Sequence, residues 1–432
     1  MLRRHLTPQV LAALGDTPVV LLHGARQAGK STLAQVIAAD AHPARYLTLD
    51  DPATLTAAKG DAAGFILGLE GDVVIDEVQR APELFVAIKV AVDRGRRPGR
   101  FLLKGSAQVF LLPQLSESLA GRMEILTLWP LSQGEIEGED GNFINRVFAP
   151  RLILPTGGMS REDLARRIVM GGYPEVVLRR PPRRAAWFRS YITTILQRDV
   201  RDIMQIERLD EMPRLLAVLA GRTGTLLNVA DLSRTLGIPQ TTLHRYLTLL
   251  QATFLIQLVP AWTANVRKRL LKTPKIILAD TGLAAHLVGT DVRGVTSNVE
   301  LWGAFLETFV AMELVKQITW SKIRPALYHF RTAKGEEVDL VLEAPSGDLV
   351  AVEVKAAAGL GANDFRGLRT LAAISGRRFK RGVLLYLGDQ ALPFGQNLYA
   401  VPISSLWTWQ VARDRRSAAA RSMARVERAR RR

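Results

Sequence analysis

The sequence predicts an α/β protein, with a parallel sheet that has helices on both faces in its first part and a second α/β domain near its end. Three patterns support this prediction. The apolar run 19–22 leads into a glycine-rich loop, and the apolar run 73–75 ends in two acidic residues. Residues 337–355 read as two strands joined by a turn, with charged side chains on one face. Uninterrupted apolar runs are typical of parallel strands that are buried on both faces.

The glycine-rich loop has the composition of a phosphate-binding loop. Residues 24–31 read GARQAGKS and are followed by a helical pattern. Glycines let backbone N–H groups turn inward around phosphates, and the following helix presents its positive end to them. Lys30 is expected to reach the β- and γ-phosphates, and Ser31 to bind Mg²⁺. The expected cofactor-binding residues are Gly24, Ala25, Arg26, Gln27, Ala28, Gly29, Lys30, Ser31 and Thr32.

The loop pattern could be a chance match in a glycine-rich turn, but the two acids that follow residues 73–75 make a chance match less plausible. Ligands gather at the carboxyl ends of parallel strands. Asp76 is expected to contact Mg²⁺ through water, and Glu77 to polarise the water that attacks the phosphate. Acids at this place could also cap a helix, but the neighbouring phosphate loop disfavours that role. The two patterns together predict a P-loop nucleoside triphosphatase with ATP and Mg²⁺ as cofactors.

Two further residues are candidates for the same site. Ser106 ends the predicted strand 100–106, where a polar sensor of the γ-phosphate would lie, although a serine in a Gly-Ser turn would look the same. Arg122 could stabilise transition-state charge, including that on a neighbouring subunit's nucleotide in a homo-oligomer. A solvated arginine is the alternative for Arg122.

Composition limits the classes of function. The chain has 432 residues, of which 48% are hydrophobic and 23% are charged, as in folded proteins of two to four domains. No apolar stretch approaches the roughly 20 residues that span a bilayer, so no membrane is expected. The chain has no cysteine, which excludes disulfides, thiolate metal ligands and a cysteine nucleophile. A cytoplasmic location is the simplest expectation.

The charge distribution bears on the partners. The net charge is +17, and residues 411–432 contain nine arginines against two acids, a net +7 that leaves +10 for residues 1–410. This tail suits either an arm that binds nucleic acid or a solubilising terminus. The basic remainder of the chain favours a polyanionic partner such as DNA.

Residues 226–257 contain a helix-turn-helix pattern. Asn228 is expected to cap the first helix, Gly237 to end it and Pro239 to open the second. The strand-like residues 254–259 would add a wing, which predicts a winged-helix module. Such a module either reads DNA or serves as a rigid spacer. In the first case the residues in the major groove would be Thr241, Thr242, His244 and Arg245.

The two C-terminal strands hold a second candidate site. Residues two apart on a strand share a face, so Glu353 and Lys355 point together, and Asp339 lies on the paired strand. Glu307 lies on the preceding helix and could approach them. Carboxylates at this spacing could hold Mg²⁺ through Glu307, Asp339 and Glu353, while Lys355 steadies a scissile phosphate. A surface sheet with alternating charges is the alternative.

The sequence resembles a family of prokaryotic AAA+-type ATPases whose C-terminal half is a domain of unknown function similar to PD-(D/E)xK nucleases. The resemblance covers nearly the whole chain except the basic tail. It implies ATP binding at Lys30 and Ser31, hydrolysis through Asp76 and Glu77, and Ser106 as the sensor. Residues 104–107 read Lys-Gly-Ser-Ala, where family members more often have Thr-Gly-Ser-Ser. The matching stretches are residues 24–31, 49–52, 74–79, 105–106, 118–122, 171–175, 280–283, 337–339 and 352–355.

The resemblance also suggests a domain organisation. We expect a P-loop ATPase domain at 1–165, a helical linker with a winged helix at 166–265, a nuclease-like domain at 266–410 and the Arg-rich tail at 411–432. Two functions follow from it. One is an ATPase coupled to nucleic-acid binding or cleavage. The other is a nucleotide-dependent switch or scaffold, whose catalytically inactive nuclease-like domain binds DNA or a protein.

Overall fold

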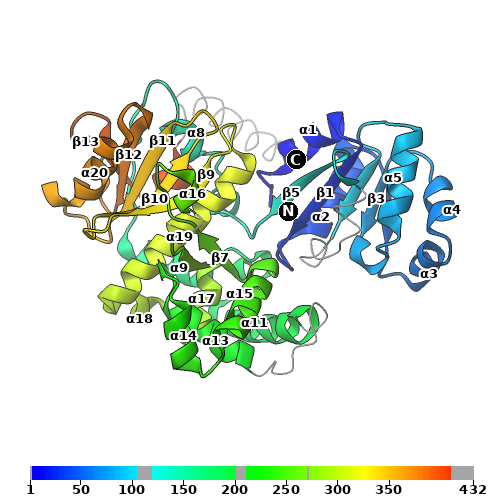
Figure 1. The fold of residues 1–432 in the computed structure, drawn as a ribbon, viewed down its shortest axis with the longest axis horizontal. Coiled ribbons are helices and arrows are strands. Elements are labelled where there is room, and N and C mark those ends of the chain that lie inside the picture. Colours follow the sequence, from blue (N-terminus) through cyan, green and yellow to red (C-terminus); the bar gives the residue numbers. More distant parts are fainter. Residues whose placement is uncertain (1, 106–118, 201–210, 270–271, 410–432) are drawn as a thin grey trace, which may run out of the picture. The chain divides into compact units, whose positions relative to one another are not determined.

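The structure, a computed structural model, describes residues 2–105, 119–200, 211–269 and 272–409 (Figure 1). Its contacts divide the chain into two compact units. Unit 1 comprises Met1–Ser132, Ala165–Val259 and Thr273–Met312, and unit 2 comprises Gln133–Leu164, Pro260–Lys272 and Glu313–Arg432. Both units are therefore built from segments that are far apart in the sequence, whereas the sequence-based boundaries run consecutively along the chain.

Unit 1 contains a five-stranded sheet in the order β2-β3-β4-β1-β5, in which every pair is parallel. The predicted parallel sheet is confirmed. β4 lies between β1 and β3 and pairs with both. Because the strands run in one direction, the residues that follow β1, β3 and β4 meet at one edge. The strands are β1 (Val19–Gly24), β2 (Arg45–Thr48), β3 (Val73–Asp76), β4 (Phe101–Lys104) and β5 (Met123–Leu128).

Helices cover both faces of this sheet because successive residues of β1 point to opposite sides. Val20 and Leu22 pack with α1 (Thr7–Asp16) and α2 (Lys30–Val36), which continues as the π-helix Ile37–Ala41. Val19 and Leu21 belong to the core on the other face. That core includes residues of α3 (Pro52–Gly60), α4 (Ala62–Leu67) and α5 (Leu84–Arg94), and a short 3₁₀ turn, Val78–Arg80, follows β3 (Figure 1).

The rest of unit 1 is mainly helical and includes the predicted helix pair. Asn228 caps the first helix of the pair by accepting a hydrogen bond from the Asp231 N–H at 3.0 Å, and Gly237 ends it with a φ of 72°. A three-stranded antiparallel sheet in the order β6-β8-β7 accompanies the pair. These elements are α13 (Glu211–Gly221), β6 (Thr225–Leu226), α14 (Val229–Leu236), α15 (Gln240–Ala252), β7 (Ile256–Val259) and β8 (Lys275–Leu278).

Further helices precede and follow this group. They are α9 (Arg161–Met170), α10 (Pro174–Val177), α11 (Pro181–Thr194), the π-helix Ile195–Val200, α17 (Thr281–Leu287), α18 (Val292–Ser297) and α19 (Val299–Trp320). The sequence also predicts one long helix at 185–205, of which residues 201–205 lie outside the described residues.

Unit 2 is built on a six-stranded mixed sheet in the order β13-β14-β12-β11-β10-β9. The predicted hairpin is present, with β10 (Glu337–Glu343) antiparallel to β11 (Leu349–Val354). α20 (Arg366–Ser375) packs on it through Leu368 and Leu371. The other strands are β9 (Ala326–Arg331), β12 (Phe379–Tyr386), β13 (Leu392–Pro393) and β14 (Leu398–Pro402). The remaining helical segments are α7 (Gln133–Glu137), α8 (Phe143–Val147), α16 (Val266–Arg269), Ala362–Phe365, Gly376–Arg378 and α21 (Ser405–Thr408).

None of the helices in the described part of the chain is long and apolar enough to cross a membrane.

Candidate nucleotide-binding site

The glycines of the phosphate loop occupy positions that other residues could not adopt without strain. Gly24 has a φ of +142°, and a Cβ there would lie 2.1 Å from the Leu128 carbonyl oxygen. Gly29 has a φ of +93° at the start of α2. Gln27 also has a positive φ, 59°, which is uncommon for a residue with a side chain. The loop is thus held in a strained turn, as binding loops often are.

Side chains that are distant in the sequence hold this loop. The guanidinium of Arg4 donates to the Ala28 carbonyl at 2.5 Å and to the Trp129 carbonyl at 2.6 Å. The Tyr191 hydroxyl donates to the Arg26 carbonyl at 3.4 Å. No local sequence pattern could reveal this role of Arg4, because its partners lie 24 and 125 positions away.

Lys30 is buried in the loop with its charge facing neutral acceptors. Its ammonium donates to the Gly24 and Ala25 carbonyl oxygens at 2.8 and 2.7 Å. Burial, and secondly the charge of Lys104, lower the pKa of Lys30 to about 7. Carbonyl oxygens position an ammonium without neutralising it, so a phosphate would be a better partner than these two groups.

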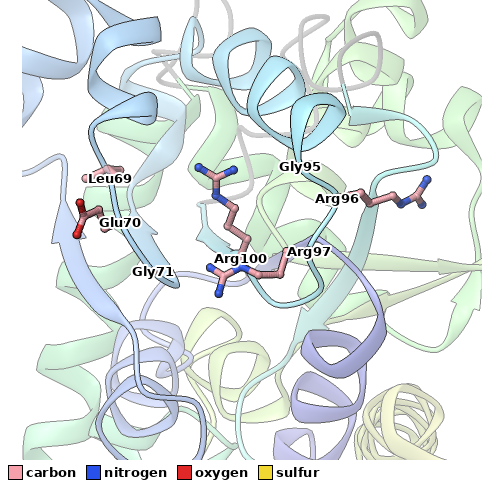
Figure 2. A pocket seen from close by; sticks show the side chains of 7 residues that line it. All are labelled: Leu69, Glu70, Gly71, Gly95, Arg96, Arg97 and Arg100. Atoms are coloured by element: carbon pink, nitrogen blue, oxygen red, sulfur yellow. The ribbon is translucent and has the colours of Figure 1, made fainter.

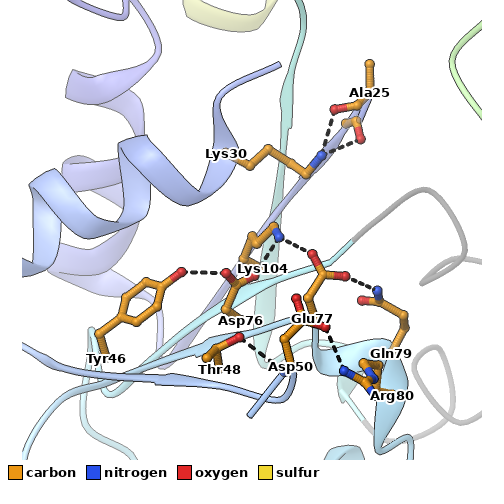
Figure 3. Close-up of polar contacts among 11 residues, drawn as sticks. Ala25, Lys30, Tyr46, Thr48, Asp50, Asp76, Glu77, Gln79, Arg80 and Lys104 are labelled. Atoms are coloured by element: carbon orange, nitrogen blue, oxygen red, sulfur yellow. Dashed lines mark hydrogen bonds and ion pairs between the residues drawn. The ribbon is translucent and has the colours of Figure 1, made fainter. Parts of the chain in front are cut away.

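Asp76 lies at the end of β3, where two side chains contact it (Figure 3). The Tyr46 hydroxyl donates to its Oδ2 atom at 2.5 Å, and the Lys104 ammonium lies 2.6 Å from its Oδ1 atom. Lys104 is positioned by the register between strands, because it stands opposite Asp76 in the β3–β4 pair. Burial, followed by the hydrogen bond to Asp76, raises the pKa of Tyr46, so its hydroxyl keeps its proton.

Glu77 follows Asp76 in a left-handed conformation, with a φ of 57°. Its carboxylate forms an ion pair with Lys104 and accepts a hydrogen bond from the Gln79 amide at 2.5 Å. Burial alone would raise the pKa of Glu77, but the charge and hydrogen bond of Lys104 and the hydrogen bond of Gln79 outweigh it and lower the pKa. Glu77 is therefore an ionised carboxylate that could accept a proton from water.

Two of the residues that were predicted to hold Mg²⁺ lie near one hydroxyl group. Ser31 is close enough to the Tyr46 hydroxyl to affect its pKa, and the same hydroxyl donates to Asp76. A hydroxyl and a carboxylate that share one neighbour can reach one cation, and oxygen ligands are those that Mg²⁺ prefers. The donor set fits the ion.

Of the two further candidates, Ser106 lies outside the described residues. Arg122 lies at the other edge of the sheet from the phosphate loop. It precedes β5, whose first residue pairs with Val19, whereas the loop follows the last residue of β1. Five residues of strand separate these edges by about 16 Å. The Arg122 guanidinium binds both carboxylate oxygens of Asp93, at 2.6 and 3.0 Å. A role for Arg122 within its own subunit is therefore not supported, and action across a homo-oligomer stays a prediction.

The second candidate site differs from its expected form. Lys355 pairs with Asp364 at 2.5 Å, and Asp339 accepts a hydrogen bond from the Val354 N–H at 2.9 Å. In unit 1, Glu307 pairs with Lys275 at 2.7 Å. Among the described residues, no group of three or more His, Cys, Asp or Glu could hold a metal ion. The three-acid site of Glu307, Asp339 and Glu353 stays a prediction: Glu307 belongs to unit 1, where it forms an ion pair, whereas Asp339 and Glu353 belong to unit 2.

The glycine pair at 171–172, part of a stretch that matches the resembling family, has a structural explanation. Asp280 caps α17 by accepting from the Leu283 N–H at 2.9 Å, and it also accepts from the Gly172 N–H at 2.7 Å. A Cβ on Gly171 would lie 2.2 Å from the Asp280 carboxylate. Through these two hydrogen bonds, Asp280 connects the glycine pair to the start of α17, two segments of unit 1 that are distant in the sequence.

A cavity of about 530 Å³, here called the arginine pocket, is lined by Arg96, Arg97 and Arg100 together with Glu70 (Figure 2). The loops that form it lead into β3 and β4, so it lies at the amino edge of the sheet, away from the phosphate loop. Arg97 pairs with Asp72 at 2.6 Å.

The other two guanidinium groups of the arginine pocket bind backbone carbonyls. Arg96 donates to the Gly121 carbonyl and Arg100 to the Ala91 carbonyl, each at 3.3 Å. These contacts orient the two positive charges without neutralising them.

Family models match most of the chain. An AAA domain model matches residues 16–137, and two domains of unknown function match residues 161–293 (DUF8612) and 302–406 (DUF4143). The first match covers the parallel sheet and the phosphate loop, and the last covers most of the six-stranded sheet.

Among solved structures, the chain is similar to a Walker-type ATPase of Pyrococcus abyssi, with a TM-score of 0.43, 17% identity and coverage of 66% of this chain and 95% of the other. It is also similar to the RuvB Holliday junction branch migration motor of Thermotoga maritima, with a TM-score of 0.30, 19% identity and coverage of 59% and 89%. Because both TM-scores are below 0.5, the family assignment rests on the sequence matches.

Two mycobacterial proteins, each described as uncharacterized, are 33% identical to the chain over 406 residues. One is from Mycobacterium bovis and the other from Mycobacterium tuberculosis, and the match spans 94% of this chain and 85% of theirs. With these relatives, the chain belongs to a family of prokaryotic AAA-type ATPases with a C-terminal domain of unknown function.

Proposed function

We propose that the protein is a Mg²⁺-dependent ATPase whose site is formed by the phosphate loop and the ends of β3 and β4. In this proposal Lys30 binds the β- and γ-phosphates, Ser31 and Asp76 hold the ion, and Glu77 accepts a proton from the attacking water. Bound Mg²⁺ would supply positive charge to offset the phosphate oxygens.

The position of Glu77 after the end of β3 supports this proposal most directly. A general base must carry its negative charge before the reaction, and the ion pair with Lys104 keeps Glu77 ionised. Glu77 follows Asp76 on the strand whose end meets the phosphate loop at one edge of the sheet. Its left-handed backbone conformation directs the side chain away from the course of the strand.

The Glu77→Gln variant tests the role of this residue. The amide keeps the size of the side chain but cannot accept the proton, so ATP turnover should fall by roughly two to four orders of magnitude while ATP still binds. The matched control is Glu83→Gln, which makes the same change at an exposed residue before α5 and should keep full turnover. Turnover that survives in Glu77→Gln would mean that another group activates the water.

A second function, nucleic-acid binding, is favoured by the arginine pocket. We propose that it contacts the phosphates of a nucleic-acid backbone, because two of its guanidinium groups are held by carbonyls rather than by carboxylates. The net charge of +17 supports the same class of partner.

The salt dependence of DNA binding tests this second proposal. If each guanidinium contacts one phosphate, the double variant Arg96→Ala/Arg100→Ala should reduce the slope of log affinity against log salt by roughly 1.8. The control removes the same charge from two other exposed arginines, Arg183→Ala/Arg293→Ala. If the slope of log affinity against log salt were equal in the two double variants, the arginine pocket would not be the site that contacts nucleic-acid phosphates.

No specific observation favours phosphodiester cleavage by unit 2. Lys355 is engaged by Asp364, and no three-acid cluster is formed among the described residues. Asp339, Glu353 and Lys355 therefore stay a predicted site, and the alternative of a binding or scaffolding role for this domain is left open.

A further inference from the structure

All four carboxylate oxygens of Asp76 and Glu77 face donors that belong to the protein (Figure 3). Lys104 contacts one oxygen of each acid. The remaining oxygen of Asp76 accepts from Tyr46, and that of Glu77 accepts from Gln79, each at 2.5 Å. Lys104 donates a hydrogen bond to Glu77, whereas its contact with the Oδ1 atom of Asp76 is an ion pair in which that buried oxygen accepts no hydrogen bond.

The two lysines of the site have different electrostatic roles. The Lys30 ammonium is held by two neutral carbonyls, whereas the Lys104 ammonium is compensated by two carboxylates. Only 7% of the Lys104 side chain is exposed, so water screens these ion pairs little. Lys104 also lies on β4, between the strand of the phosphate loop and the strand of the acids.

Lys104 is thus the cation that both acids contact in the structure. A divalent ion and an ammonium compete for the same carboxylate, because both need its negative charge. While the charge of Lys104 compensates that of Asp76, less negative charge is available to attract Mg²⁺. While Lys104 and Gln79 hold Glu77, its oxygens cannot receive a proton from water.

We propose that Lys104 is an internal counter-cation that holds Asp76 and Glu77 in a closed pair, and that nucleotide-bound Mg²⁺ must displace it. This inference rests on the proposed ATPase function and adds a positioning residue to it. Lys104 thereby sets the concentration of free Mg²⁺ at which the site engages a nucleotide. A residue that only stabilised the buried acids would change the stability of the fold and leave this concentration unchanged.

The test measures ADP binding to the full-length protein by calorimetry at a series of free Mg²⁺ concentrations. Lys104→Met removes the charge and keeps the aliphatic stem. It should lower the half-saturating concentration of Mg²⁺ by roughly tenfold. A neighbouring unit charge changes the affinity of a carboxylate for a proton by about this factor or more, and we expect a similar effect on Mg²⁺. The matched control is Lys59→Met, which removes a charge from an exposed residue of α3 and should leave the concentration unchanged.

Lys104→Met could prevent folding, because it leaves two buried carboxylates without their counter-charge. The same comparison is therefore made between Glu77→Gln and Glu77→Gln/Lys104→Met, in which only one carboxylate is left. The same shift to lower Mg²⁺ is expected there.

An unchanged or higher Mg²⁺ requirement in the folded Lys104→Met proteins would overturn the inference, because Lys104 would then be structural or would itself bind the nucleotide. Such a result leaves the ATPase proposal intact. A wild-type protein that binds no nucleotide at any Mg²⁺ concentration would overturn both.

Discussion

At the scale of single residues, burial controls the protonation of the groups around the phosphate loop. His23 precedes the loop and hydrogen-bonds to Thr127 at 2.7 Å. Burial, and secondly the charge of Lys30, lower the pKa of His23 to about 3. The imidazole is therefore neutral in the folded protein at every pH above this value, whereas in the unfolded chain it gains a proton below about pH 6.5.

This difference predicts a loss of stability in acid. Because the folded pKa is depressed, the contribution of His23 is fully present above pH 6.5 and is lost as the pH falls toward 3. His23→Gln cannot titrate, so between pH 7 and pH 4.5 the variant should lose about 2–3 kcal/mol less stability than the wild type. Denaturant unfolding at several pH values measures this. The control is His244→Gln, at an exposed histidine of α15, which should match the wild type. An identical pH dependence in His23→Gln and the wild type would contradict the buried neutral state.

The sequence predicted only part of this residue-level chemistry. Lys30, Asp76 and Glu77 were predicted because their spacing within short motifs is enough to place them. The contact of Tyr46 with Asp76 was not predicted, because it depends on how β2 pairs with β3, which no local pattern specifies. Lys104 was noticed only as a departure from the related sequences, and its two ion pairs depend on the position of β4 between β1 and β3.

At the scale of elements, local signals located helices and strands better than they located their partners. The cap at Asn228, the break at Gly237 and the hairpin of β10 and β11 were all predicted from short patterns and are present. β8 completes the small sheet by pairing with β7 and with the more distant β6, and its strand was not predicted.

The C-terminal candidate site shows the same limit. The hairpin of β10 and β11 was predicted, but the spacing of its charged residues does not say which opposite charges meet. Glu307 pairs with Lys275, and Lys355 pairs with Asp364 on a short 3₁₀ turn. Each ion pair joins segments whose proximity depends on the tertiary fold, so strand periodicity could not reveal it.

At the scale of the whole molecule, the chain combines two units, of which unit 1 contains the candidate ATPase site. We expect the phosphate loop of unit 1 to bind the phosphates of ATP through the ammonium group of Lys30. Lys30→Ala should keep the fold, because Lys30 is held by neutral carbonyls and its removal leaves no carboxylate without a partner.

Calorimetric titration of ATP with Mg²⁺ into the wild type and Lys30→Ala is the most direct measurement. The wild type should bind ATP, and Lys30→Ala should bind it roughly 100-fold more weakly or not at all, since losing one partner of a buried charged contact costs about 2–5 kcal/mol. Lys59→Ala, at an exposed lysine of α3, should bind as the wild type does. Equal affinity in folded Lys30→Ala and the wild type would contradict the assignment of this loop as the nucleotide-binding site.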